Sequence, residues 1–287
     1  MTRHSANSKN RRRSSRPDLA TLGGLLLGVG GVLAGLLLEG GRIRDVAQIT
    51  AALIVLGGTI GAVMITTPLA ILSSAVRRLP QVFFDRGPDE HAAVGEILAL
   101  AAKARRSGIV SLEEDADEIS DPLLRKAMTL AIDGADLQQI QEMMELEISM
   151  LEQRGEAEAR VFEAAGGYAP TIGIIGAVLG LIQVMKDLAN IDEVGRGIAV
   201  AFVATVYGVG SANLFFLPAA GKLRARLQDL IRVRELIQEG VAGIVEGLNP
   251  KLIRLKLEAY VPSASSDTSD RSAKRHGASA TTAIAEG

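Results

Sequence analysis

Residues 168–182 read YAPTIGIIGAVLGLI, and residues 197–223 read GIAVAFVATVYGVGSANLFFLPAAGKL. Both stretches are uncharged through their centres, and the apolar runs they belong to, 168–185 and 197–219, approach or reach the roughly 20 residues that a bilayer-spanning helix needs. Strands of a membrane β-barrel would be shorter and would alternate in polarity. Since an unpaired backbone amide costs several kcal/mol in lipid, we predict that both runs are membrane-spanning helices.

Two further apolar runs precede them, at 19–38 and 46–75. The first follows a basic stretch, as the apolar part of a signal peptide would. It is longer than such a part, however, and it ends in Glu39-Gly40-Gly41-Arg42 without a small-residue cleavage site. We therefore expect a retained first span. The sequence predicts an all-α, four-transmembrane-helix integral membrane protein with a helical cytoplasmic domain inserted between spans two and three.

The composition supports packed membrane helices and excludes several classes of function. Hydrophobic residues make up 48% of the chain but aromatic residues only 3%, and the 31 glycines favour close approach of helix backbones. The net charge of -2 argues against nucleic-acid binding. Without cysteine the chain has no disulfide, thiol nucleophile or Cys-ligated metal site. No nucleotide-binding loop, metal-ligand spacing or catalytic constellation is present, so we expect neither an enzyme nor a bound cofactor or metal.

The placement of lysine and arginine predicts the direction of the spans. Segment 1–18 carries six of these residues, whereas the loop after the first span carries only Arg42 and Arg44. Further basic residues follow the second and fourth spans: Arg77, Arg78, Lys222, Arg224 and Arg226. We expect the spans to occupy 19–76 and 168–219, with both termini and segment 77–167 on the cytoplasmic side.

Segment 77–167 shows helix signals throughout. Apolar residues recur at helical spacing over 91–106, up to Gly108. Ser111 and Glu114 fit a capping box, Asp121-Pro122 fits a second helix start, and Asp133-Gly134 fits its end. A further helix, with apolar residues at three- and four-residue steps, is expected to lead into the third span: Leu137, Ile140, Met144, Ile148 and Leu151.

Two segments follow the fourth span. Segment 220–260 is predicted to form cytoplasmic amphipathic helices, because Leu223, Leu227 and Leu230 continue at helical spacing through Ile237. The first of these helices can pack beside the helix that enters span three. Segment 261–287 is rich in Ser, Thr and Ala and has no periodicity, so we predict a disordered tail.

The third and fourth spans carry the features most informative about function. Gly173, Gly176 and Gly180 make one flat face, which favours packing against a neighbouring helix over lining a pore. Span four carries polar side chains in apolar surroundings: Thr205, Tyr207, Ser211 and Asn213. No span has an Asp, Glu, Lys, Arg or His near its middle. If the protein conducts ions, a partner must therefore supply the titrating group, and this chain the hydroxyl-bearing wall around it.

These two blocks closely resemble the paired third and fourth spans of MotA/PomA-type stator A-subunits of the bacterial flagellar motor, in the MotA/TolQ/ExbB proton channel family. The likeness spans most of residues 20–255 in the family's order, and it is carried by further blocks at 57–61, 67–69, 104–108, 112–114, 125–126 and 133–134. The resemblance implies a multi-pass protein of the bacterial inner membrane. In that family five A-subunits ring a pair of single-span MotB/PomB-type B-subunits, whose Asp binds the ion, and ion flow drives rotation. The implied partners are the B-subunit, the rotor switch complex, membrane lipid and further copies of the chain, but no nucleic acid.

Residue roles follow from the resemblance position by position. Thr205 is implied to be a pore-lining hydroxyl that faces the partner's Asp, with Ala177 and Tyr207 also on the ion pathway. The conformational prolines are Pro170 and Pro218, and the rotor-facing charges are Arg105, Arg106, Glu113 and Glu114. Sodium-driven relatives typically carry a threonine where this chain has Ala177, so we expect H⁺ rather than Na⁺. Ala116, between Asp115 and Asp117, departs from an acid found in many relatives.

Other readings remain open at this point. Thr205 can simply hydrogen-bond the backbone of its own helix, the two prolines can mark helix ends, and Arg105 and Arg106 can form an ordinary solvated patch. The alternative function is an ExbB/TolQ-like proton-channel subunit that energises outer-membrane processes, although such relatives usually have three spans. A non-conducting structural membrane protein with a docking domain is a third possibility.

Overall fold

The structure, a computed structural model, describes residues 16–261 except 86, 88 and 187. The predicted tail 261–287, apart from Val261, and residues 1–15 of the predicted N-terminal segment lie outside the described residues. The chain divides into two compact units. Of the described residues, the spanning unit comprises those within 16–87 and 149–230, and the helical unit comprises those within 88–148 and 231–261.

The described residues are almost entirely helical, and four helices are long and apolar enough to cross a membrane, which confirms the predicted fold class. The first span is α1 (Leu19–Leu38). The second is a run of α3 (Ile49–Ala52), the π-helical turn η1 (Leu53–Gly57) and α4 (Gly58–Thr66). The third lies in α10 (Leu137–Lys186), and the fourth in a run of α11 (Ile191–Ser211), the π-helical turn η3 (Ala212–Phe216) and α12 (Leu217–Val245).

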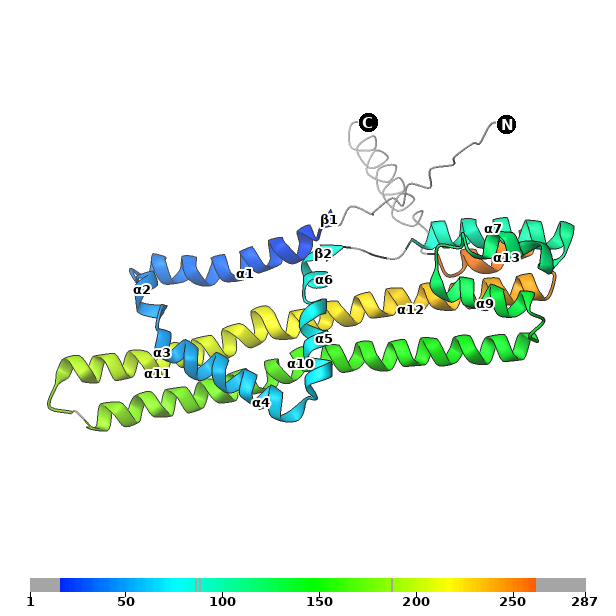
Figure 1. The fold of residues 1–287 in the computed structure, drawn as a ribbon. Coiled ribbons are helices and arrows are strands. Elements are labelled where there is room, and N and C mark those ends of the chain that lie inside the picture. Colours follow the sequence, from blue (N-terminus) through cyan, green and yellow to red (C-terminus); the bar gives the residue numbers. More distant parts are fainter. Residues whose placement is uncertain (1–15, 86, 88, 187, 262–287) are drawn as a thin grey trace, which may run out of the picture. The chain divides into compact units, whose positions relative to one another are not determined.

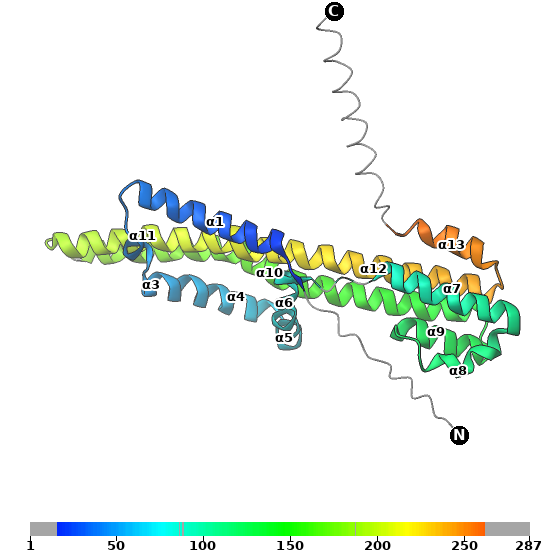
Figure 2. The same ribbon diagram turned by 90° about the horizontal axis from the view of Figure 1, so that it is seen from above.

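Within the spanning unit, α10 and α11 form an antiparallel hairpin that projects past α2 (Ile43–Val46) and α3, while α1 runs alongside α11 (Figures 1 and 2). Buried residues of α4, α5 (Leu69–Arg78), α6 (Pro80–Phe83), α10 and α12 form its larger core, which includes Val63, Ala75, Val82, Phe162 and Leu223. A two-residue antiparallel pair, β1 (Arg16–Pro17) with β2 (Phe84–Asp85), joins the start of α1 to the chain after α6. This pair was not predicted from the sequence.

The second span ends earlier than expected. The apolar run 46–75 is not one helix, because α4 stops at Thr66 and α5 begins at Leu69 in a new direction, across α10 (Figure 1). Thr67 is extended, with φ -127° and ψ 129°. Pro68 causes the break, since its ring excludes the preceding residue from helical geometry. The predicted length of the run was wrong because it rested on hydropathy alone and did not take this proline into account.

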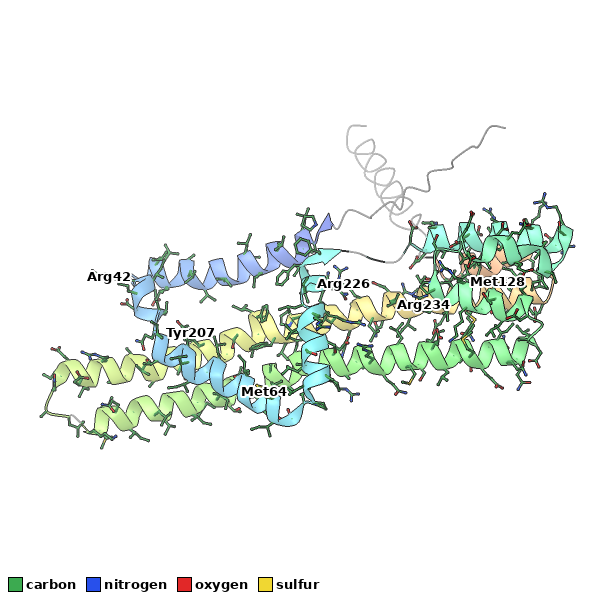
Figure 3. The ribbon with its side chains drawn as sticks, viewed as in Figure 1. Arg42, Met64, Met128, Tyr207, Arg226 and Arg234 are labelled. Atoms are coloured by element: carbon green, nitrogen blue, oxygen red, sulfur yellow. The ribbon has the colours of Figure 1, made fainter. Side chains whose placement is uncertain are left out.

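The helical unit is built from α7 (Glu90–Ser107), the 3₁₀ turn η2 (Ile109–Leu112), α8 (Glu113–Ala116), α9 (Pro122–Ile132), α13 (Pro250–Glu258) and the adjoining parts of α10 and α12. Its core is aliphatic and includes Ile97, Leu124, Met128 and Leu236. Figure 3 labels Met128 within this unit.

Three of the four predicted end signals of this unit are confirmed. Asp121 caps α9 by accepting from the N–H groups of Leu123 and Leu124, with Pro122 in the first turn. Gly108 and Gly134 follow their helices with φ of +81° and +88°, a conformation that favours glycine.

The predicted capping box at Ser111 and Glu114 is wrong. The Ser111 hydroxyl donates instead to the Gly108 carbonyl (2.6 Å), inside the 3₁₀ turn, and Leu112 stands before α8. The sequence pattern fits both arrangements. In the structure Gly108 has a positive φ, and the 3₁₀ turn begins at the next residue, Ile109.

Candidate functional site

The glycine face of α10 packs backbone against backbone on α11. A Cβ atom built on Gly180 would lie 2.8 Å from both the Ala201 nitrogen and the Gly197 oxygen, and one on Gly173 would lie 2.9 Å from the Ala204 oxygen. Real Cβ atoms essentially never come within 3.0 Å of such atoms. The glycines therefore set the distance between spans three and four, which agrees with the packing role predicted for them.

The two predicted conformational prolines lie inside helices and not at their ends. Pro170 sits within the 50-residue α10, and Pro218 is the second residue of α12, directly after the π-helical turn η3. A proline ring normally clashes with the carbonyl four residues before it. For Pro218 that residue is Leu214, which lies in the wider η3 turn. Pro170 faces Gly208 of α11, and a Cβ atom built on Gly208 would lie 3.2 Å from the Pro170 Cα. Pro218 thus adjoins a local irregularity of the helix, of a kind that is common at functional sites, whereas Pro170 lies in unbroken α-helix, where it removes one backbone hydrogen bond.

Thr205 lies half-buried on α11, and its hydroxyl donates to the Ala201 carbonyl of the preceding turn (3.3 Å). It also lines a cavity of about 800 Å³, together with Tyr207 and Ser211. The remaining wall comes from the first and second spans and from α11, and includes Val29, Val32, Leu33, Ala52 and Leu56. The cavity is apolar apart from these three hydroxyls, so it can surround a charged group but cannot itself neutralise one.

Ala177 lies half-buried on α10 and is not among the residues that line this cavity. Tyr207 has a specific partner that the sequence did not indicate. Its hydroxyl donates to the Val46 carbonyl (2.5 Å) and accepts from the Gln48 backbone N–H (3.4 Å). Figure 3 shows Tyr207 on α11 where α3 crosses it. This side chain therefore ties the fourth span to the start of the second.

A buried carboxylate lies on α10 before its apolar part. Glu158 is 2% exposed and pairs with Arg78 of α5 (2.6 Å) and with Arg154 one turn earlier (3.4 Å). This pairing explains why Arg78 points into the protein. The pairing is not evident from the sequence, because charged residues recur through 152–163, a pattern that is typical of a solvated helix face.

A second ionic cluster lies at the start of α1. Asp18 is 11% exposed and pairs with Lys222 (2.5 Å) and Arg226 (3.0 Å) of α12. The hydrogen bond from Lys222 and a further one from the Thr21 backbone N–H lower the pKa of Asp18 from 3.8 to about 2. Aspartate before an apolar helix signals an N-cap in sequence, but its partners some 200 residues away leave no local signal.

The four predicted rotor-facing residues lie near the turn between α7 and α8. Arg105 and Arg106 end α7 and are exposed, as are Glu113 and Glu114 at the start of α8. An ion pair between Lys103 and Asp115 (2.8 Å) helps to join these helices. The Arg105 guanidinium donates to the Gly247 carbonyl (3.3 Å) and that of Arg106 to the Ala102 carbonyl (3.1 Å). These bonds use only part of each guanidinium, so the structure leaves an exposed corner of mixed charge.

Within the described residues, no group of three or more His, Asp or Glu side chains is placed to hold a metal ion. The arrangement offers packed helices, a hydroxyl-lined cavity and a charged corner.

Comparisons with known proteins agree with the predicted family along most of the chain. The model of the MotA/TolQ/ExbB proton channel family matches residues 115–236, and that of the Motility protein A N-terminal region matches residues 22–108. Motility protein A of Bacillus subtilis is 33% identical over 252 residues, which cover 85% of this chain and 91% of that protein. Chemotaxis protein PomA of Vibrio alginolyticus is 32% identical over 244 residues, covering 85% of this chain and 95% of that protein.

Solved structures match as well. A chain of the C. jejuni MotAB structure superposes with a TM-score of 0.82 at 33% identity, covering 87% of this chain and 98% of its own length. The flagellar MotAB stator complex of Bacillus subtilis gives a TM-score of 0.78 at 33% identity, covering 85% of this chain and 96% of the other. The chain therefore belongs to the MotA/TolQ/ExbB proton channel family, in its motility protein A branch.

Proposed function

We propose that this protein is the A-subunit of a bacterial flagellar stator, a multi-pass inner-membrane protein that forms an ion channel with a MotB-type B-subunit. The solved relatives are MotAB complexes, which supports that partner. One observation carries the mechanism: the described spans hold hydroxyls but no Asp, Glu, Lys, Arg or His near their middle. An ion that crosses here needs a carboxylate from another chain, because an intramembrane charge site is otherwise missing.

In this mechanism several copies of the chain, five by analogy with the family, surround a pair of B-subunit helices. Each Thr205 hydroxyl lies near the partner's carboxylate as it is protonated and released. One elementary charge that crosses the membrane contributes about 2.3 kcal/mol per 100 mV. Pro170, Pro218 and the η3 turn supply the joints at which the spans bend during each step.

We assign H⁺ as the transported ion. Ala177 offers no oxygen, and hard cations such as Na⁺ need several oxygen ligands, whereas a proton needs only the carboxylate. A sodium pathway would have to be completed by backbone carbonyls or by the B-subunit.

Both termini and the helical unit lie in the cytoplasm in this proposal, since Arg77, Arg78, Lys222 and Arg224 follow spans two and four. The exposed corner formed by Arg105, Arg106, Glu113 and Glu114 then faces the rotor. The apolar outer faces of the spans face lipid or neighbouring copies.

The stator is favoured over an ExbB/TolQ-like role by the four spans and by the N-terminal match to Motility protein A. Membership of a channel family also makes the chain a transporter or motor subunit and not a classical enzyme.

The test is motility of a strain that lacks this gene and is complemented with variants. Thr205→Ala is compared with Thr66→Ala, because the Thr66 hydroxyl also donates to a carbonyl of its own helix (Ala62, 3.2 Å) but does not line the cavity. We expect Thr205→Ala to slow swimming with flagella still assembled, and Thr66→Ala to swim normally.

Ion use is tested in the same strains. Replacing sodium with potassium should leave the speed unchanged, and a protonophore should stop swimming. Normal swimming of the deletion strain, with a defect in outer-membrane uptake instead, would overturn the stator assignment. Sodium-dependent swimming would overturn only the choice of ion.

A further inference from the structure

The first span makes little contact with the rest of its own chain. None of the 20 residues of α1 is buried. Near its middle, a Cβ atom on Gly28 would lie 3.0 Å from the Leu214 side chain of η3. Towards the start of α1, a cavity of about 540 Å³ separates it from η3 and α12, with Ala20, Thr21 and Gly24 on one wall. Apolar packing therefore does little to fix this end of the span.

Polar contacts of Asp18 hold this end of the first span instead. Its backbone N–H donates to the Phe83 carbonyl (2.8 Å), and its carboxylate accepts from the Thr21 N–H (3.1 Å). The same carboxylate pairs with Lys222 (2.5 Å) and Arg226 (3.0 Å). Figure 3 shows Arg226 on the side of α12 that faces the start of α1.

The two cations belong to the segment that follows Pro218. Lys222 and Arg226 are four residues apart and so share one face of α12, four and eight residues after the proline. A helix N-cap needs only a side-chain oxygen, and asparagine or serine would serve equally well. Two cations around one nearly buried carboxylate exceed what capping needs. A partly buried ion pair adds little net stability, because desolvation offsets much of its Coulombic gain, and in some proteins such pairs fix one arrangement of elements instead.

We propose that Asp18 is a positioning residue, which fastens the cytoplasmic end of the first span to α12 so that α1 follows the Pro218 segment as one body during ion transfer. This inference rests on the proposed stator function, because it assigns Asp18 to the motion that couples ion flow to rotation. The fourth-span helix then bends at η3, before Pro218, and the first span moves together with the segment that follows Pro218.

The first experiment tests whether Asp18 holds the first span in place, in membranes that need contain no flagellar motor. The chain has no cysteine, so a pair introduced at Gly28 and Leu214 reports the distance between α1 and η3 through its oxidative cross-linking rate in isolated membranes. We expect Asp18→Asn, which keeps the cap but removes the charge, to slow cross-linking by about fivefold, the ratio that roughly 1 kcal/mol produces. Glu39→Gln, a charge removed at the other end of α1, is the matched control and should have no effect.

A double-mutant cycle tests the partner. Lys222→Gln should slow cross-linking as Asp18→Asn does, and the double variant should be no slower than either. The proposed role of Asp18 would be overturned if the Asp18→Asn variant and the parent pair cross-link at equal rates. It would also be overturned if the effects of Asp18→Asn and Lys222→Gln add in the double variant. Because no flagellum is needed, this result stands whether or not the stator assignment does.

The second experiment separates positioning from stability in single tethered motors, where each stator unit adds one step of rotation speed. Asp18→Asn should reduce the height of each step, and the disulfide-locked Gly28→Cys/Leu214→Cys protein should stall until it is reduced. Fewer steps of normal height would make Asp18 merely structural. A locked pair that keeps its step height would show that α1 does not move relative to η3. Either result refutes the proposal.

Discussion

Replacing Gly208 with alanine should separate spans three and four, and the structure gives the size of the effect. A Cβ atom at this position would lie 2.5 Å from the Ala169 oxygen, where ordinary contact begins at 3.4 Å, so the backbones must part by about 0.9 Å. Overpacking of this kind typically costs 1–3 kcal/mol, of which the better helix propensity of alanine returns up to about 1 kcal/mol. We therefore expect a net loss of about 1–2 kcal/mol.

Gly210, on the same helix, is the matched control, because a Cβ atom there meets nothing within 4 Å. Without tryptophan in the chain, the melting midpoint of the purified protein in detergent is best followed by circular dichroism of the helices. Gly208→Ala should lower this midpoint by about 2–8 °C, and Gly210→Ala should leave it unchanged or raise it slightly. Equal midpoints for the two variants would show that Gly208 does not set the distance between the spans.

Three further predictions use the same melting assay. Tyr207→Phe removes the hydrogen bond to the Val46 carbonyl and should cost about 1 kcal/mol, whereas Tyr168→Phe should cost less. A larger loss from Tyr168→Phe would contradict the proposed tie between spans two and four. Glu158→Gln leaves Arg78 without its carboxylate and should cost about 1–3 kcal/mol, and adding Arg78→Gln should cost little more; additive losses would show that the pair is not coupled. The pKa of Asp18 is about 2 in the folded protein and 3.8 ordinarily, so its stabilising effect is complete above pH 4 and disappears as the pH falls towards 2. Asp18→Asn should therefore lose less stability than wild type over that pH range, and parallel acid curves would exclude this contribution.

The sequence predicts well those features whose causes are local. The four spans follow from hydropathy, and the ends of α7 and α9 follow from Gly108, Asp121 and Gly134, each of which acts through its own backbone. The glycine face of α10 was also predictable, because three residues at helical spacing define a surface before its partner is known.

The remaining features depend on residues distant in the chain or on competition between local signals. Pro68 breaks an apolar run that hydropathy treats as continuous, and Ser111 satisfies a sequence pattern but enters a different turn. Arg226 lies 208 residues from Asp18, and Arg78 lies 80 residues before Glu158 (158 − 78), so neither ion pair leaves a local signal. The roles of Thr205, Ala177 and the rotor-facing charges stay predictions, because they concern contacts with other chains.

The η3 turn has a consequence for insertions and deletions. A π-helical turn holds one residue more than a regular α-helical turn, so the wider turn takes up that residue and the helix beyond it keeps its facing. Lys222 and Arg226 lie beyond η3, where they meet Asp18. Deleting one residue from Ala212–Phe216 should therefore restore regular winding and leave both cations facing the first span. Deleting one residue between Pro218 and Lys222, where no wider turn takes up the change, would instead turn both cations by about 100° away from Asp18.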